Sequence, residues 1–256
     1  MANVTSTRLI LCIKWGDVFS PEYVNILYRA CRDHLTGPIQ FVCLTDDTAG
    51  LLPEISALPI PNIGLTQDQW YTRGVWPKLA LFRKKLHNLS GRALFIDLDM
   101  MIVGSLDPFF DETYPLTTLD VGDGWRPNGD APPEVGTGVF AFNIGEQSQI
   151  LDGFMADSNG VIATFHNEQD YVSEMGQGIG FWPTGTVISF KRFLRRGLGR
   201  DLFESPQPPG PNVAIVAFHG APRPIDLVTT KVWGQFPHIG LGPVPWVQEY
   251  WKKYGS

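Results

Sequence analysis

The sequence has few cysteines, no long apolar run and no excess of positive charge. Its three cysteines, Cys12, Cys31 and Cys43, lie in apolar segments and form no C-x-x-C pair, so we expect buried reduced thiols and no disulfide framework. No uncharged apolar run approaches the roughly 18 residues of a membrane span. The apolar run at 9–13 is too short for a signal peptide. These absences predict a cytoplasmic protein.

The balance of charge and hydropathy excludes further classes of protein. Twenty basic residues against 26 acidic ones give a net charge of −6 among 256 residues, which argues against a general nucleic-acid binder. Hydrophobic residues make up 43% of the chain, enough for a sizeable core, so global disorder is excluded. The 27 glycines and 21 prolines indicate many ordered loops, which is where functional sites tend to lie.

Apolar and amphipathic segments alternate from residue 8 to about residue 103. Strands are predicted at 8–14, 39–44, 55–60 and 93–96, and helices at about 21–36 and 76–86. This alternation is typical of a mostly parallel, Rossmann-like α/β sheet with helices on both faces. The second half is less regular, with strands expected at 137–143 and 213–218 and helices at 146–156, 167–175 and 245–253. We expect a single domain over 1–256, with a nucleotide-binding half at about 1–119 and a half at about 120–256 that completes the metal and acceptor sites.

The most informative motif is Asp97-Leu98-Asp99, which follows the apolar strand Leu94-Phe95-Ile96. Open α/β sheets bind ligands at the carboxyl ends of their strands. Alternate side chains of an extended segment point to the same side, so both carboxylates can face one site. Paired carboxylates suit a hard divalent cation that also holds substrate phosphates. A strand that simply ends in a polar turn is the alternative.

Four segments together resemble the GT-A glycosyltransferases, in particular the glycogenin-like group (family 8). Besides the D-x-D motif at 97–99, the segment 138–143 resembles the family's glycine-valine-asparagine motif, and Glu168-Gln169-Asp170 resembles its D-Q-D motif. The segment 218–224 resembles its late histidine motif, and Trp76-Pro77-Lys78-Leu79 lies upstream as in the family. The chain departs from the family at Thr137 (Asn in the family), at Glu168 (Asp) and at Arg223, which stands for Lys in a contracted histidine motif.

The resemblance implies a GT-A fold and metal-dependent transfer from a nucleotide diphosphate sugar, commonly a UDP-sugar, with retention of anomeric configuration. It implies Mn²⁺ (or Mg²⁺) held by Asp97, Asp99 and His219. It places Gln169 near the anomeric carbon. The remaining implied contacts are Glu168 with Asp120 or Asp123 for sugar hydroxyls, Lys14, Trp15, Gly16 and Asp46 for the nucleoside, and Lys78, Arg223, Gly220 and Leu98 for the rest of the donor. The acceptor, whether carbohydrate, lipid or protein, is not indicated, and neither is the oligomeric state.

Two further patterns leave alternatives open. Five cations lie within residues 191–200, and Arg192, Arg195 and Arg196 would share one face of a helix. A solvated face is the ordinary interpretation, while an acidic acceptor or a weak association with an anionic membrane surface is the sharper one. The aromatic and lysine-rich residues at 245–254 favour a helix packed on the domain over interfacial anchoring or an acceptor-stacking surface.

Other functions with similar motifs stay possible at this stage. A haloacid-dehalogenase-like phosphatase also has D-x-D after an apolar strand, although normally on its first strand. A sugar-nucleotide nucleotidyltransferase binds a nucleotide and a metal at a comparable sheet edge. A catalytically decayed sugar-binding protein is the third alternative, since Thr137 and Glu168 depart from the family pattern.

Overall fold

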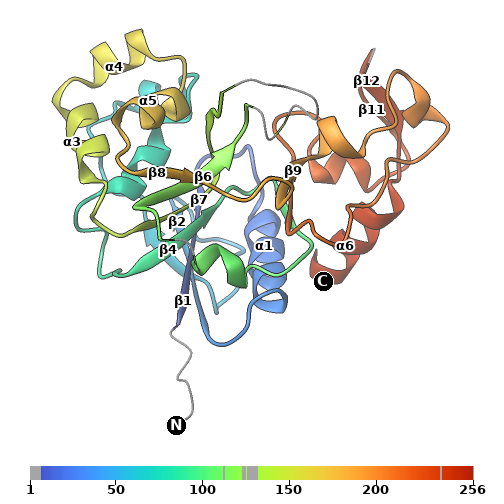
Figure 1. The fold of residues 1–256 in the computed structure, drawn as a ribbon, viewed down its shortest axis with the longest axis horizontal. Helices are drawn as coiled ribbons and strands as arrows, with labels where there is room; N and C mark the ends of the chain where they lie inside the picture. The colour runs from blue at the N-terminus through green and yellow to red at the C-terminus, as the bar shows by residue number, and fades with distance from the viewer. Residues whose placement is uncertain (1–6, 112, 123–124, 126–131, 237, 256) are drawn as a thin grey trace.

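A seven-stranded sheet forms the centre of the protein in a computed structural model that describes residues 7–111, 113–122, 125, 132–236 and 238–255 (Figure 1). The strand order is β3-β2-β1-β4-β7-β6-β8. The four strands β1 to β4 run parallel, β7 is antiparallel to both β4 and β6, and β8 is parallel to β6. The strands are β1 (Arg8–Lys14), β2 (Ile39–Thr45), β3 (Ser56–Pro59), β4 (Arg92–Ile96), β6 (Leu116–Asp120), β7 (Val135–Asn143) and β8 (Ile179–Phe181).

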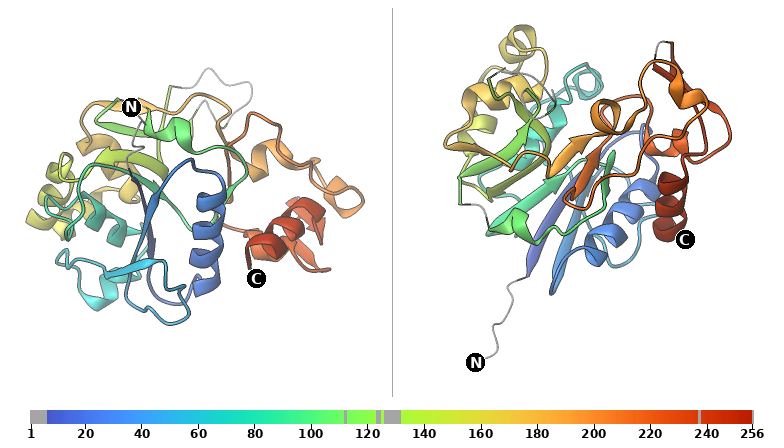
Figure 2. Two further views of the ribbon diagram at one scale, coloured as in Figure 1. Left: turned by 90° about the horizontal axis from the view of Figure 1, so that it is seen from below. Right: turned by 45° about the vertical axis from the view of Figure 1, so that its right-hand side comes forward.

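Helices cover both faces of this sheet, as the sequence pattern predicts (Figure 2). Alternate residues of β1 divide between two cores, with Ile10 and Cys12 in one and Leu9, Leu11 and Ile13 in the other. The first core includes α1 (Pro21–Asp33) and α6 (Pro245–Gly255), and the second includes η1 (Trp76–Phe82), α3 (Ser148–Ala156) and α5 (Glu168–Met175). The short helices α2 (Gln67–Trp70), η2 (Asp107–Phe110) and α4 (Ser158–Thr164) complete this part.

A second, three-stranded sheet stands beside the first in the order β5-β10-β9. Its strands are β5 (Met100–Ile102), β9 (Val187–Ser189) and β10 (Ile215–Ala217), and β5 begins directly after Asp99. A hairpin of β11 (Val232–Gln235) and β12 (His238–Leu241) lies near the short helices η4 (Phe190–Leu194), η5 (Arg200–Leu202) and η6 (Pro224–Leu227). A third apolar cluster that includes Phe190, Phe218 and Trp233 holds this region together.

The C-terminal helix packs on the domain, as its aromatic pattern favours. Trp251 is buried and its Nε1 donates to Glu22 Oε1 on α1 at 3.1 Å. Tyr250 Oη accepts from the Ile102 backbone N at 3.1 Å, which ties α6 to β5. Within the described residues, none of the helices combines the length and the apolar character needed to cross a bilayer.

Two local expectations need correction, and one is confirmed. The helix expected at 76–86 is a 3₁₀ helix that ends at Phe82, because Arg83 is already extended. The shared helical face of the cations is wrong, because η4 is a single π-helical turn and the Arg195 guanidinium turns inward to Asp201, with Nε to Oδ2 at 2.9 Å. Cys12, Cys31 and Cys43 are buried free thiols, as predicted.

Candidate active site

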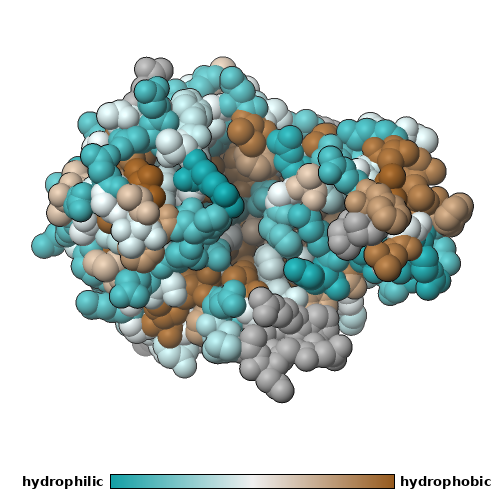
Figure 3. Space-filling view, turned by 90° about the horizontal axis from the view of Figure 1, so that it is seen from above, coloured by the Kyte–Doolittle hydropathy of each residue, from teal (hydrophilic) through white to brown (hydrophobic). Residues whose placement is uncertain are grey.

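A cavity of about 330 Å³ opens at the carboxyl end of β4, between the two sheets. In the space-filling view from above, a hollow lies between the larger and the smaller lobe of the molecule (Figure 3). The residues that line the cavity come from β5, β6, β7, α5 and η4 and from segments that follow strands: Asp97, Asp99, Met100, Leu119, Val121, Trp125, Gly138, Gln169, Arg192 and His219. Four of the residues that the sequence marks as functional therefore share one space: Asp97, Asp99, Gln169 and His219.

Backbone hydrogen bonds hold the D-x-D segment between the sheets. Asp97 N donates to Gly138 O at 2.9 Å, which fixes the segment to β7. Phe218 N donates to Asp99 O at 3.0 Å, so the residue just before His219 is bonded directly to the second aspartate. The late histidine and the aspartates, 120 residues apart in the sequence, thereby meet at one edge.

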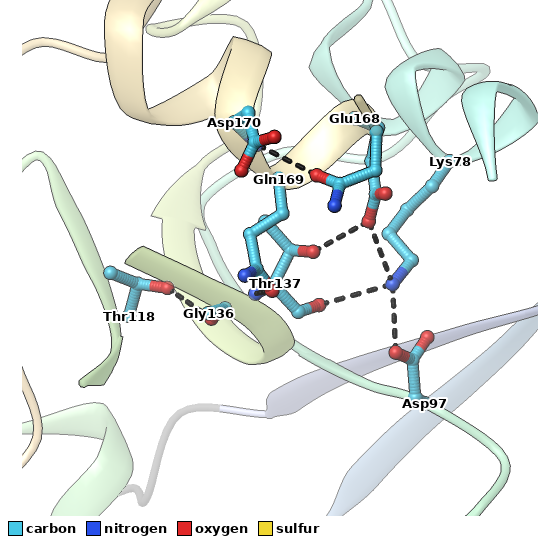
Figure 4. A network of polar contacts seen from close by, with 9 residues as sticks. Lys78, Asp97, Thr118, Gly136, Thr137, Glu168, Gln169 and Asp170 are labelled. Atoms are coloured by element: carbon cyan, nitrogen blue, oxygen red, sulfur yellow. Dashed lines mark hydrogen bonds and ion pairs between the residues drawn. The ribbon is translucent and has the colours of Figure 1, made fainter. Parts of the chain in front are cut away.

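A buried lysine organises the first aspartate (Figure 4). Lys78 Nζ lies 2.7 Å from Asp97 Oδ2 and 3.2 Å from Glu168 Oε1, and it donates to Thr137 O at 3.3 Å. The Lys78 side chain is 5% exposed, so the ammonium has little contact with solvent. Burial lowers the pKa of Lys78, but the charges of Asp97 and Glu168 outweigh burial and the pKa is raised. Lys78 is thus a cation that holds two carboxylates in place.

Both aspartates of the D-x-D segment have raised pKa values. Burial raises the pKa of Asp97 to about 6, although the Lys78 ammonium opposes that shift. Burial and then the neighbouring charge of Asp97 raise the pKa of Asp99 to about 7. A further positive charge beside Asp99 would oppose both pKa shifts, because it favours the ionised form of each carboxyl group.

His219 is held from three sides. Its Nε2 is hydrogen-bonded to Ser189 Oγ at 2.7 Å, its ring stacks on Trp125 with 4.7 Å between centroids, and its backbone O accepts from Lys191 Nζ. Burial, followed by the charges of Lys191 and Arg192, lowers the pKa of His219 to about 4. The imidazole is therefore neutral at physiological pH, which is the form that ligates a metal.

Gln169 and Thr137 face each other between α5 and β7. Asn167 caps α5 by accepting from Asp170 N at 2.9 Å, which places Glu168 and Gln169 in the first turn. Gln169 Oε1 accepts from Thr137 N at 3.2 Å, while Thr137 Oγ1 donates to Glu168 Oε1 at 2.6 Å. Gln169 lines the cavity, whereas the Glu168 carboxylate is turned to Lys78 and Thr137.

The residues expected to contact the nucleoside lie together at the ends of β1 and β2. Asp46 Oδ2 accepts from Gly16 N at 2.9 Å, and Lys14 Nζ donates to Gly16 O at 3.3 Å. Gly16 has φ +58°, and a Cβ there would lie 2.9 Å from Tyr71 Cε1, so glycine is needed for both the turn and the close approach. Trp15 is half-buried next to this turn. The carboxyl edge of the sheet thus carries both the predicted metal ligands after β4 and the predicted nucleoside contacts after β1 and β2.

Other predicted site residues are not in the lining of the cavity. Arg223 Nη1 donates to Val18 O at 2.6 Å, and the guanidinium lies over the Phe19 ring at 5.8 Å. Asp120 Oδ1 accepts from the backbone N of Gly122 and of Glu134, so it organises its own loop. The Leu98 side chain is buried in the apolar core. Gly220 is exposed with φ +74°, and Asp123 lies outside the described residues.

A metal-binding arrangement is present only in part. In the described portion of the chain, no group of three His, Cys, Asp or Glu side chains is close enough to enclose a metal ion. The donor set still fits a divalent cation, because the carboxylates and a neutral imidazole line one cavity and both aspartates have raised pKa values. Asp97 Oδ2 is already paired with Lys78, which leaves Asp99 as the carboxylate best suited to a metal.

Sequence reasoning did not single out four residues of this site, namely Trp125, Ser189, Lys191 and Arg192. Trp125 lies in the glycine-rich loop, and Ser189 ends the short strand β9. Lys191 and Arg192 appeared only as members of a charge cluster. A buried serine followed by two cations is a weak signal in a sequence, and only the pairing of β9 with β10 brings these residues to His219.

No protein-family model and no curated protein matches the chain. Among solved structures, it is similar to the galactosyltransferase LgtC in complex with donor and acceptor sugar analogues, with 13% identity, 97% of this chain and 96% of that chain covered, and a TM-score of 0.59. It is also similar to the apo-form glycosyltransferase GlyE of Streptococcus pneumoniae TIGR4, with 13% identity, a TM-score of 0.58, and 98% of this chain and 60% of that chain covered. The bifunctional glycosyltransferase WbbM in its apo structure gives 13% identity, a TM-score of 0.56, and coverage of 98% and 52%.

These likenesses extend over nearly the whole chain and concern the arrangement of its elements. The mostly parallel sheet, the helices on both faces and the position of the D-x-D segment agree with what the motifs imply. The chain therefore has the GT-A fold of these glycosyltransferases.

Proposed function

We propose that this protein is a metal-dependent glycosyltransferase that uses a nucleotide diphosphate sugar, in particular a UDP-sugar, and a carbohydrate, lipid or protein acceptor. The observation that carries the proposal is the convergence of Asp97, Asp99, Gln169 and His219 on one cavity at the carboxyl edge of the sheet. The fold supports a transferase over the phosphatase and the nucleotidyltransferase. Asp97 and His219 are each fixed by a specific partner, Lys78 and Ser189, which argues against a catalytically decayed site.

The cation would be held by Asp99 and His219, with Asp97 directly or through water. Mn²⁺ suits this mixed set of oxygen and nitrogen donors, and Mg²⁺ is the alternative. When bound, such a cation acts as a Lewis acid that neutralises charge on the diphosphate as it leaves. The bond from Ser189 to His219 Nε2 would reserve Nδ1 for the cation.

The other side chains position the reactants. Lys78 keeps Asp97 ionised and fixed in direction. The Thr137 backbone N–H holds Gln169 Oε1, and we place this amide near the anomeric carbon, consistent with retention of configuration. In the transfer, the bond between the anomeric carbon and the diphosphate oxygen breaks, and a bond forms between the anomeric carbon and the acceptor oxygen. The diphosphate leaves with the electron pair, and the acceptor hydroxyl proton passes to a diphosphate oxygen.

Calorimetric titration of UDP tests the donor site directly. We expect heat of binding with Mn²⁺ and none with EDTA. Asp99→Asn should abolish the metal-dependent part, while the matched variant Asp152→Asn, an exposed carboxylate on α3, should bind as the wild type does. Donor hydrolysis with a panel of UDP-sugars then identifies the sugar. Absence of binding for UDP and for GDP, with and without metal, would overturn the proposal in favour of the phosphatase or the decayed site.

A further inference from the structure

A second cavity of about 720 Å³ has His219 in its lining but no residue of the D-x-D segment. Its lining includes Lys191, Arg192 and Arg195, together with His219, Gln235 and Phe236. Arg192 and His219 also line the first cavity, so the two cavities are neighbours across one wall. No residue of the motifs that resemble the glycosyltransferases, apart from the histidine segment 218–224, contributes to this second space.

The lining of this second cavity is cationic although the protein as a whole is acidic, with a net charge of −6. No Asp or Glu is among the described residues that line it. Arg195 is paired with Asp201 at 2.9 Å, but no ion pair is found for Lys191 or Arg192 among the described residues. Cations gathered without carboxylates repel one another, and although Asp99 in the first cavity attracts Lys191, no side chain in the lining of the second cavity supplies a negative charge.

Two more observations indicate what that partner is. The Arg195 side chain is 7% exposed, and its Nη2 is a buried donor without a hydrogen-bond acceptor, which is costly unless a ligand supplies one. Phe236, which is 86% exposed, and Gln235 also line this cavity. An exposed aromatic face and an amide suit the apolar face and the hydroxyls of a sugar ring. The cations suit a phosphate or carboxylate.

We propose that the second cavity binds the acceptor, and that this acceptor is a sugar bearing a phosphate or carboxylate group. The inference rests on the proposed transferase function, since Arg192 and His219 border both cavities and an acceptor in the second cavity would lie next to a donor in the first. Arg192, exposed and shared by both cavities, and Lys191, bonded to the His219 carbonyl, are the main anion-binding residues. Arg195 contributes from the wall.

Ligand-observed NMR with matched sugars tests this in the absence of donor. Glucose 6-phosphate and glucuronate carry the anion, and glucose is the uncharged reference. We expect at least one of the two anionic sugars to bind about tenfold tighter than glucose, since charge-assisted hydrogen bonds are the strong ones. Arg192→Gln and Lys191→Gln should each reduce that preference severalfold. The matched control Arg200→Gln, which removes an exposed cation paired with Glu204, should leave it unchanged.

Each adverse outcome has a definite meaning. Equal binding of glucose and both anionic sugars, or binding of none, overturns the acceptor site. If Arg192→Gln and Lys191→Gln weaken UDP binding but leave the sugar preference intact, the cations serve the donor diphosphate and the proposal is wrong. Failure of the transferase proposal is recognised separately, as absence of metal-dependent UDP binding, because the sugar titration uses neither metal nor nucleotide.

Discussion

Thr137 Oγ1 donates a hydrogen bond to Glu168 Oε1 at 2.6 Å, and these are two of the three positions at which the chain departs from the motifs it resembles. Thr is one bond shorter than Asn in its reach, and Glu is one methylene longer than Asp. The shorter side chain on β7 is therefore met by the longer one on α5. Two departures that each count against function in the sequence form a single contact in the structure.

This reciprocity predicts strong coupling in a double-mutant cycle. Thr137→Asn crowds the Glu168 carboxylate, and Glu168→Asp withdraws it from Thr137, so each single change should lower kcat/KM by about tenfold or more. The double variant Thr137→Asn/Glu168→Asp should recover most of the loss, with a coupling free energy of about 1–3 kcal/mol. Steady-state kinetics of the four proteins measures this. Simple additivity of the two single effects would refute the compensation.

Removal of the Lys78 charge should be among the most damaging changes to stability. Lys78→Met leaves Asp97 and Glu168 without their shared cation, and breaking a buried pair in this way costs about 3–5 kcal/mol. Urea denaturation measures the difference. Lys253→Met, which breaks the exposed pair with Asp33, is the control and should cost no more than about 1 kcal/mol. Similar losses in both variants would show that the buried pairs of Lys78 contribute no more to stability than an exposed ion pair.

The raised pKa values of the aspartates predict an unusual pH dependence for the metal-free protein. The pKa of Asp99 is raised from 3.8 to about 7, so between these values the folded protein binds more protons than the unfolded chain. The free energy of unfolding from this group therefore falls as pH rises from about 4 to about 7. Asp99→Asn should stabilise the metal-free protein at pH 8 by about 1–3 kcal/mol and make no difference at pH 4.

Urea denaturation in EDTA at the two pH values measures the effect. Asp152→Asn should show no such gain. The same protons oppose metal binding, so Mn²⁺ should raise the melting temperature more at pH 8 than at pH 6. A metal-free Asp99→Asn variant that is no more stable than the wild type at pH 8 would contradict the raised pKa of Asp99.

Ser189 should control metal affinity through His219. Ser189→Ala removes the hydrogen bond to Nε2 and frees the ring to change its orientation, so we expect Mn²⁺ to bind about tenfold more weakly. Ser105→Ala, at an exposed hydroxyl far along the chain, is the control. Titration of Mn²⁺ in the presence of UDP provides the measurement. Unchanged affinity would mean that Trp125 and Lys191 alone position the imidazole.

The part of the fold nearest the N-terminus is predictable from the sequence because parallel strands buried on both faces are continuous apolar runs. Residues 8–14 and 93–96 have this form, and each ends in the polar residues that mark the site. The strand β6 is not recognisable, because Leu116–Asp120 contains two threonines and its place in the sheet depends on pairing with β7. In the second sheet, β10 lies within the strand predicted at 213–218, whereas β5 and β9 have three residues each and give too short a pattern to be recognised.

The candidate site is predictable to a similar extent. Asp97, Asp99, Gln169 and His219 each stand at the end of a strand or the start of a helix, where local patterns are informative. The placement of Lys78 is not, because a lysine in a Trp-Pro-Lys helix start has the same local pattern whether it is solvated or buried. Only the approach of α5 and β7 to η1 determines that it holds two carboxylates. The turn of Arg195 towards Asp201 likewise depends on a π-helical turn that residue spacing does not indicate.

The contact between α1 and α6 has a consequence for the order in which the protein is built. The Tyr23 and Trp251 rings lie 5.0 Å apart, and Arg29 Nη1 donates to Tyr254 O at 2.6 Å. The partners of these α1 side chains thus lie more than 200 residues later in the sequence. During synthesis, α1 is made more than 200 residues before α6, so one face of α1 stays uncovered until residue 254 has been made. Such distant pairings slow folding and expose apolar surface meanwhile. The core to which α1 contributes is therefore completed only when α6 has been made.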